Sequence, residues 1–305
     1  MSYPRDFLHQ KIQWSDIDVS YLDQLIRLSR LEDLEGAGLH SVPFYQGDIT
    51  TDSLFFSKKT SKVKIVARES LILSGIYLID LVLKVYGSSK HKIEMAVQDG
   101  DPISADQEIA LVTADTQTLL KAERVILNFL QHLSGIATNT GKFVKNLGRS
   151  STRLLDTRKT VPGYRVLEKY AVVCGGGWNH RIGLFDHLML KDNHWSESGQ
   201  LHAFKDLLEK ARSHFPDRKV EIEVDSLAQI EKALELGADI VLLDNFTNSK
   251  IQEAIEYISG RALTEASGGI TLKRLPTMSN LGLDFISIGA LTHQSQWVDI
   301  AIDAD

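Results

Sequence analysis

Hydrophobic residues in the first part of the chain recur at helix and strand spacing. Leucine, isoleucine and tyrosine return every three or four residues between Tyr21 and Leu31, which predicts an amphipathic helix. Alternation over 63–69 predicts a strand, and the apolar stretch 74–87 predicts a second helix. Two further strands are expected on either side of the turn-rich segment 99–107.

A long helical pattern follows over 116–147, with leucines and isoleucines supplying its apolar face. Gly135 and Gly141 lie inside this pattern, and we expect them to break or kink the helix because glycine weakens a helix interior. The chain changes character near residue 150.

From residue 151 onward, short β-type runs alternate with helical stretches. This alternation predicts parallel βαβ units, which occur both in (β/α) barrels and in open doubly wound sheets. The barrel is favoured because each run ends in a polar or glycine position, and in a barrel the carboxyl ends of the strands meet at one mouth. The six runs are 151–156, 186–192, 219–226, 238–245, 261–267 and 284–290.

Composition places the chain among globular proteins and excludes several partners. Its 305 residues suffice for two domains, and 43% hydrophobic with 24% charged residues argues against long disorder. A net charge of −6 gives no global attraction for nucleic acid or an anionic membrane. A single cysteine, Cys174, excludes an internal disulfide, and no apolar run resembles a signal peptide or a membrane span. We therefore expect a cytoplasmic protein that binds neither nucleic acid nor membrane.

Segment 158–191 reverses the overall charge. It holds six lysines and arginines against two acids, together with His180 and His187. Arginine binds carboxylate or phosphate through paired hydrogen bonds, so the cluster favours a site for a polyanionic ligand. A solvated face with ordinary ion pairs would carry the same charges. No HxxxH or CxxC spacing indicates zinc.

Glycines and acids follow the later strand runs. Ser267, Gly268 and Gly269 precede a helical stretch, and glycine there lets backbone amides approach a phosphate. A tight turn without a ligand would look the same. Glu223 and Asp244 end successive strands, where they could hold sugar hydroxyls or Mg²⁺, cap a helix, or form an ion pair.

Together these segments resemble the quinolinate phosphoribosyltransferase family, the decarboxylating enzymes that make nicotinate mononucleotide for NAD synthesis. DTRKTVPGYRVLEKYAVVCGGGWNHRIGLFDHLMLKDNH at 156–194 carries most of the resemblance. Nearly the whole chain is covered, since further matches are GDITT at 47–51, ERVILNFLQHLSGIAT at 123–138, IEVDS at 222–226, LLDNF at 242–246, EASGGI at 265–270 and DFISIGALTH at 284–293.

The resemblance implies a fold and an activity. The fold is α/β, with an N-terminal α/β sandwich domain and an incomplete (β/α) barrel, the type II phosphoribosyltransferase fold. We place the sandwich at 1–125, joined by the C-terminal tail 291–305, and the barrel at 126–290. The enzyme would convert quinolinate and phosphoribosyl pyrophosphate to nicotinate mononucleotide, CO2 and pyrophosphate, with Mg²⁺ as cofactor.

The resemblance also assigns roles to residues. Arg158, Lys159, His180 and Arg181 would line the pocket for the pyridine dicarboxylate, with Lys191 bordering it on the phosphoribosyl side. Glu223 and Asp244 would face the ribose hydroxyls and hold Mg²⁺, directly or through water. Ser267, Gly268, Gly269 and Gly289 would cradle the 5′-phosphate. The residues expected to be catalytic are Lys159, Lys191, Glu223 and Asp244.

Assembly is implied as well. Arg124 lies at the family position where one subunit reaches into the other's site, which implies a homodimer with shared active sites, or a hexamer built from such dimers.

Three other functions compete with this one. A molybdenum-transport-associated paralogue with another acceptor tends to lose the KDNH sequence, which this chain keeps at 191–194. A non-catalytic phosphosugar-binding protein would have no need for the full set of charged residues. A barrel aldolase would use Lys191 as a Schiff base, which requires a lowered lysine pKa.

Overall fold

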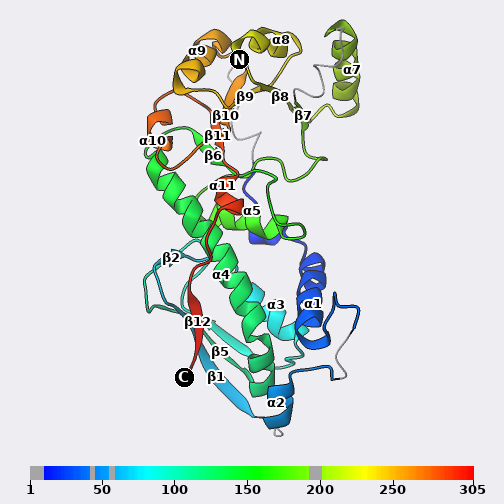
Figure 1. Ribbon diagram of the computed structural model, residues 1–305, viewed down its shortest axis with the longest axis vertical. Coiled ribbons are helices and arrows are strands. Elements are labelled where there is room, and N and C mark those ends of the chain that lie inside the picture. The colour runs from blue at the N-terminus through cyan, green and yellow to red at the C-terminus, as the bar shows by residue number, and fades with distance from the viewer. Residues whose placement is uncertain (1–9, 42–44, 55–58, 192–200) are drawn as a thin grey trace. The chain divides into compact units, whose positions relative to one another are not determined.

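The computed structural model describes residues 10–41, 45–54, 59–191 and 201–305 (Figure 1). The chain divides into two compact units. The first, here called the sheet unit, contains Ile12–Gly141, Val161–Gly176 and Ser295–Asp305. The second, the barrel unit, contains Gln10, Lys11, Lys142–Thr160 and Gly177–Gln294. The division falls inside one helix, between Gly141 and Lys142, and the domain boundary expected at residue 125 stays a prediction.

An antiparallel sheet forms the centre of the sheet unit. Its strand order is β12-β1-β5-β3, and the strands are β1 (Thr60–Ala67), β3 (Lys92–Met95), β5 (Glu108–Asp115) and β12 (Ile300–Ala304). The C-terminal strand pairs with β1 so that Ala304 lies opposite Val63. The expected turn-rich segment contains a further short strand, β4 (Pro102–Ile103), which pairs with β2 (Leu71–Ile72).

The helices of the sheet unit begin and end where local chemistry dictates. In α1 (Val19–Glu35), the carboxylate of Asp18 accepts a hydrogen bond from the Ser20 amide, and Gly36 ends the helix with φ of +68°. Helix α1 packs against α3 through its buried residues Leu22 and Ile26. The remaining helices are η2 (Trp14–Asp16), α2 (Ile49–Leu54), α3 (Leu78–Val85), α4 (Thr116–Leu147) and α5 (Arg165–Cys174).

The long helix α4 is unbroken at both of its glycines, contrary to the expected break. A side chain at Gly135 would overlap the carbonyl group of Gln296, and one at Gly141 would overlap Ile72. The two glycines therefore make room for neighbouring segments, and the helix continues because its buried apolar face outweighs their low helix propensity.

The barrel unit confirms all six strand runs expected after residue 150. The strands form one parallel sheet in the order β6-β11-β10-β9-β8-β7. Within the described residues no strand pairing joins β6 to β7, which makes the barrel incomplete, as expected. The strands are β6 (Arg153–Leu155), β7 (Leu188–Leu190), β8 (Val220–Val224), β9 (Ile240–Asp244), β10 (Leu263–Ser267) and β11 (Phe285–Ser287).

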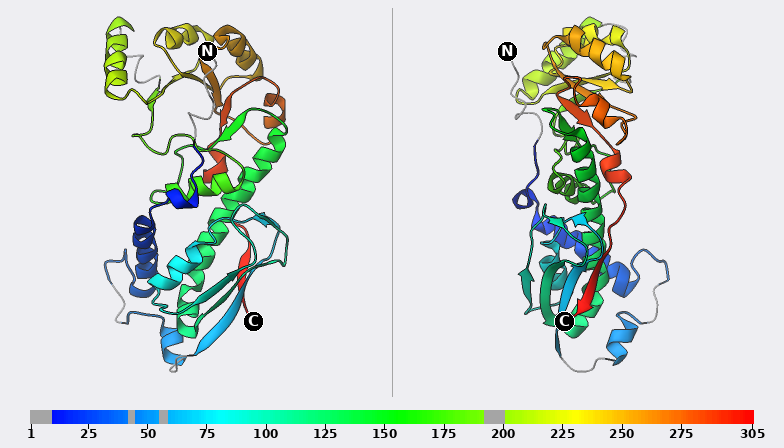
Figure 2. Two further views of the ribbon diagram at one scale, coloured as in Figure 1. Left: turned by 180° about the vertical axis from the view of Figure 1, so that it is seen from behind. Right: turned by 90° about the vertical axis from the view of Figure 1, so that its left-hand side faces the viewer.

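Helices and an apolar cluster complete the barrel unit. Helices α8 and α9 lie beside each other along the sheet (Figure 2). The helical stretch expected after Gly269 shrinks to a four-residue helix with Pro276 in its first turn. Leu155, Ile240, Leu263 and Phe285 form a buried cluster. The helices are α7 (Leu201–His214), η3 (Leu227–Gln229), α8 (Ile230–Glu235), α9 (Asn248–Ile258), α10 (Leu275–Met278) and α11 (Ala290–His293). In the described ranges, no helix has both the length and the hydropathy to cross a membrane.

The close packing at Gly135 generates a prediction. Alanine in a helix interior is normally favoured over glycine by about 0.5–1 kcal/mol. In Gly135→Ala the added methyl group would overlap Gln296, so we expect the free energy of unfolding to fall by about 1–3 kcal/mol instead. Urea unfolding followed by circular dichroism measures the change. The exposed Lys142→Ala serves as control and should change stability by less than about 0.5 kcal/mol; an increase in stability on Gly135→Ala would contradict the packing argument.

Candidate active site

A cavity of about 800 Å³ lies at the carboxyl ends of the barrel strands. Thr157, Asn245 and His293 contribute to its wall, although sequence reasoning did not select them. Every expected site residue except Arg124 lines the same cavity, namely Arg158, Lys159, His180, Arg181, Lys191, Glu223, Asp244, Ser267, Gly268, Gly269 and Gly289.

Strand register explains why residues so distant in sequence meet. Asp244 ends β9 and lies directly opposite Ser267 at the end of β10. Glu223 lies near the end of β8, and Lys191 directly follows β7. Because all these strands run parallel, their carboxyl ends form one rim. The expectation that polar strand ends converge is therefore confirmed.

Two guanidinium groups share this cavity. Burial and the nearby charge of Arg158 both lower the pKa of Arg181. Arg158 Nε is buried, and no group among the described residues forms a hydrogen bond with it. A buried donor without a partner is costly, so the site favours an anion that could supply the missing acceptor.

The two acids at the rim have oxygen atoms suited to a hard cation. Glu223 is mostly buried and pairs with Lys191 at 2.5 Å. Asp244 accepts a hydrogen bond of 2.8 Å from the Asn245 side chain. Carboxylate oxygens are the ligands that Mg²⁺ takes in proteins, often with water completing the shell. The residues present at this position therefore fit a magnesium ion.

The turn after β10 depends on its glycines. Gly268 and Gly269 have φ of +84° and +60°, which side chains rarely tolerate. A methyl group on Gly268 would also overlap the side chain of Asn245. The turn is held from the other side by Arg274, which donates hydrogen bonds to the carbonyl oxygens of Gly268 and Phe246. Sequence reasoning missed Arg274, since nothing local to its position indicates these partners.

Gly289 serves a different purpose from the other glycines. Its φ of −66° is ordinary, so no special backbone conformation requires glycine there. A side chain would come within 2.8 Å of Lys159 Cδ, and the Lys159 carbonyl accepts a hydrogen bond from Thr292 Oγ1. Gly289 therefore leaves room for the side chain of Lys159 at the cavity wall.

A buried polar cluster adjoins the cavity. Glu221 is fully buried; its Oε2 lies 2.7 Å from His187 Nε2, and both of its carboxylate oxygens lie 3.3 Å from His180 Nε2. Glu265 is also fully buried, with an oxygen 3.4 Å from His180 Nε2. Sequence reasoning missed Glu221. The signal was the alternation in VEIEV, which places residues 221 and 223 on the same face of β8.

Burial and charge act against each other in this cluster. Burial disfavours the charged form of Glu221, but His180 and His187 outweigh it and lower its pKa. Burial likewise opposes a second proton on His180, but Glu221 and Glu265 outweigh it and raise the pKa of His180. The Arg181 amide opposes that proton too, because it donates a hydrogen bond of 2.7 Å to Nδ1. Burial and the charge of Glu221 raise the pKa of Glu265.

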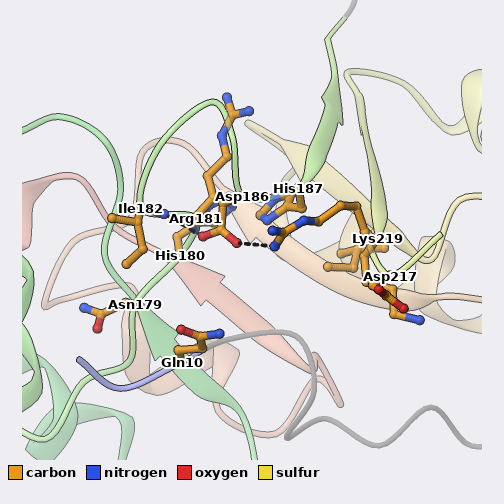
Figure 3. Close-up of a pocket in the computed structure, with 11 residues that line it drawn as sticks. Gln10, Asn179, His180, Arg181, Ile182, Asp186, His187, Asp217 and Lys219 are labelled. Carbon is orange, nitrogen blue, oxygen red and sulfur yellow. Dashed lines mark hydrogen bonds and ion pairs between the residues drawn. The ribbon is translucent and has the colours of Figure 1, made fainter. Parts of the chain in front are cut away.

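A smaller cavity of about 410 Å³ shares His180 and Arg181 with the first (Figure 3). Asp186 and Arg218 approach within 3.8 Å at its wall. His180, His187 and Glu221 place one potential ligand atom each within 4.8 Å of one another, a spacing that suits a metal ion. The histidine–carboxylate contacts already account for these groups, so we treat the cluster as a hydrogen-bond network.

Two expectations concern residues outside this geometry. Arg124 is an exposed residue of α4 in the sheet unit, and it does not line the cavity. Asp192, Asn193 and His194, which complete KDNH, lie outside the described residues.

The glycine turn yields a prediction with an internal control. Gly268→Ala and Gly269→Ala both force alanine into a left-handed conformation, but only Gly268→Ala also meets Asn245. We expect Gly268→Ala to lose about 1–3 kcal/mol more stability in urea unfolding than Gly269→Ala. Asn245 itself has φ of +56°, so Asn245→Gly can be accommodated and should restore part of the loss in the double variant. Equal losses for the two single variants would show that the overlap is unimportant.

Comparison with known proteins finds matches over most of this chain. Residues 136–303 match the quinolinate phosphoribosyl transferase C-terminal domain and residues 48–134 match the corresponding N-terminal domain. A probable nicotinate-nucleotide pyrophosphorylase [carboxylating] of Bacillus subtilis is 38% identical over 84% of this chain and 88% of its own length. The nicotinate-nucleotide pyrophosphorylase [carboxylating] of Mycobacterium leprae is 38% identical over 87% of this chain and 94% of its own.

Solved structures give the same result. The nicotinate-nucleotide pyrophosphorylase of Francisella tularensis superposes with a TM-score of 0.85 at 34% identity, covering 98% of this chain and all of that one. The enzyme of the same name from Ehrlichia chaffeensis has a TM-score of 0.82 at 32% identity, covering 97% of this chain and all of that one. Because both domains of the family match this chain and relatives are 38% identical over most of its length, the chain belongs to the quinolinate phosphoribosyltransferase family.

Proposed function

We propose that this protein transfers the phosphoribosyl group of phosphoribosyl pyrophosphate to quinolinate and releases CO2, giving nicotinate mononucleotide and pyrophosphate. The observation that carries the proposal is one cavity that combines clustered cations, two acids and a glycine turn. The cations and the glycine turn would bind the anionic groups of the two substrates, and the acids would bind the sugar. Membership of the family agrees with this reaction.

The charged residues that line the cavity indicate where each of the two substrates would bind. Quinolinate carries two carboxylates, which suit the guanidinium groups of Arg158 and Arg181. The turn at Ser267–Gly269 offers backbone amides to the 5′-phosphate. Asp244 on β9 and Glu223 on β8 come next to the β10 turn along the strand order and would accept hydrogen bonds from the ribose hydroxyls. Lys191 borders the same region through its ion pair with Glu223.

The reaction needs electrostatic stabilisation more than a base. The ring nitrogen of quinolinate forms a bond to the anomeric carbon as pyrophosphate leaves, through a state in which the sugar carries positive charge. The carboxylates of Glu223 and Asp244 would stabilise that charge. The bond between C2 and its carboxylate then breaks, CO2 leaves, and the electron pair left on C2 is stabilised by the positively charged ring nitrogen before C2 takes up a proton. Decarboxylation after ribosyl transfer is therefore the easier order.

A magnesium ion would be held by Glu223 and Asp244, directly or through water. When bound, it would supply positive charge for the pyrophosphate leaving group. Lys191 already neutralises Glu223 in its absence, so a bound ion would compete with this ion pair.

The assembly is proposed to be a homodimer with shared active sites, alone or within a hexamer. The support is the family resemblance, in which Arg124 lies at the position where one subunit reaches into the other's site, and Arg124 is exposed on α4. In the proposed dimer it would contact the quinolinate carboxylates bound by the other subunit.

The test mixes the purified protein with Mg²⁺, phosphoribosyl pyrophosphate and quinolinate labelled with ¹³C in the 2-carboxylate. We expect nicotinate mononucleotide and labelled CO2 in equal amounts, with activity lost on adding EDTA. Nicotinate lacks the 2-carboxylate and would leave a buried cation unpaired, so its kcat/KM should be lower by about 100-fold or more. Absence of the product would refute the function, and equal use of nicotinate would refute the assignment of the cationic wall.

The shared site is tested by mixing inactive subunits. Arg124→Ala should reduce activity by about 100-fold or more, and Arg124→Lys should restore little because an ammonium group cannot form paired hydrogen bonds. Lys159→Ala should also be nearly inactive. A mixed dimer of the two variants would contain one intact site and one site with both defects, so subunit exchange should return about a quarter of the wild-type activity. If exchange is verified and nothing returns, Arg124 acts in its own subunit.

A further inference from the structure

We infer that Glu221 is a positioning residue: through His180 it holds the backbone of Arg181 and so fixes part of the cationic wall of the cavity. The inference rests on the proposed function for its kinetic readout. Glu221 does not line either cavity, and its side chain is fully buried in β8. It therefore acts on a ligand only through other residues.

His180 is the link between Glu221 and the wall. Its Nε2 faces Glu221 at 3.3 Å, and its Nδ1 accepts a hydrogen bond of 2.7 Å from the Arg181 amide. While Nδ1 accepts this bond it carries no proton, and the proton on Nε2 faces the buried carboxylates, which by raising the pKa of His180 also favour a second proton on the ring. Asp156 fixes the same segment by accepting a hydrogen bond of 2.9 Å from the His180 amide.

His187 holds Glu221 from the other side. Its Nε2 lies 2.7 Å from the second carboxylate oxygen, and the two imidazole rings are 5.2 Å apart. His180 Nε2 lies 3.3 Å from both carboxylate oxygens and His187 Nε2 contacts Oε2, so rotating the carboxylate would break the contact with His187. The orientation of His180 is therefore fixed by groups in β8 and immediately before β7.

If packing were the only requirement at position 221, an acid would be unfavourable there. Apolar side chains of the same sheet, such as Ile240 and Leu263, form a buried cluster. A carboxylate removed from water is costly, and a well-packed apolar residue often stabilises such a position more. Glu221 also lies near a cation whose pKa is lowered by burial and by Arg158, and the charge of Glu221 partly offsets this effect. Both contributions of Glu221, positional and electrostatic, are directed at Arg181.

The test compares Glu221→Gln with Glu253→Gln, an exposed position on α9. The glutamine side chain keeps the shape, but it loses the negative charge and turns an NH2 group toward one of the two rings. We expect kcat/KM for quinolinate to fall by about 10- to 100-fold in Glu221→Gln, with the KM for phosphoribosyl pyrophosphate within about threefold of wild type. Glu253→Gln should match wild type. Wild-type kinetics in Glu221→Gln, or equal loss for both substrates, would overturn the inference.

A readout that does not need turnover separates this inference from the proposed function. In protein with ¹⁵N-labelled histidine, the ring signals of His180, assigned with His180→Gln, should move in Glu221→Gln and stay in Glu253→Gln. If wild-type protein forms no product, the function fails while this comparison still decides the inference. Unmoved His180 signals overturn it.

A second variant covers the case in which Glu221→Gln does not fold. His187→Phe keeps an aromatic ring but removes the donor that holds the second oxygen of Glu221. We expect the His180 signals to move and the KM for quinolinate to rise at least about threefold. Wild-type values for both would overturn the inference.

Discussion

The site depends on keeping two positively charged guanidinium groups, those of Arg158 and Arg181, close to each other. Burial lowers the pKa of Arg181, and the nearby charge of Arg158 lowers it further. Such a cluster binds a dianion strongly only if the protein keeps it charged and in place beforehand. Counter-charges must therefore come from the protein itself. Glu221, Asp186 and Glu223 are the acids that offset the repulsion at Arg181.

Because of these counter-charges, the interior of the barrel contains buried acids. Parallel strands are usually apolar on both faces, and β9 follows that rule over Ile240–Leu243. Strand β8 departs from it, since Glu221 is buried between apolar residues. Its cost is reduced by two histidines, and Glu265 lowers the cost of its own burial through a raised pKa. Glu221 thus contributes to the binding site even though it does not line the cavity.

Sequence reasoning succeeded where the position of a residue within a strand determines its location in the fold. Polar residues at the ends of parallel strands meet at one rim, so Glu223, Asp244 and Ser267 could be assigned to one site before any geometry was known. The incomplete barrel followed from the family resemblance, because the alternation of strands and helices alone also allowed an open sheet. Whether Arg124 belongs to the site depends on assembly, which strand order does not encode.

The rule failed where a residue acts through partners distant in sequence. Glu221 was passed over because only the end of its strand was considered, and Arg274 because its acceptors lie on two other loops. The structural role of each glycine was the hardest to predict from the sequence. Gly268 is required by a left-handed backbone, Gly289 by the side chain of Lys159, and Gly135 by the carbonyl of Gln296. A single residue type thus serves three constraints that only spatial neighbours distinguish.

The proposed reaction places a limit on the cationic wall. A cation that pairs with the 2-carboxylate stabilises it before CO2 leaves and has no anion to bind afterwards, so it slows that step. A cation that pairs with the 3-carboxylate keeps its partner throughout and costs nothing at that stage. The site therefore works best when its strongest charges meet the carboxylate that stays. Orientation of Arg181 then matters as much as its charge, and an acid that fixes that orientation from behind contributes to the rate as well as to binding.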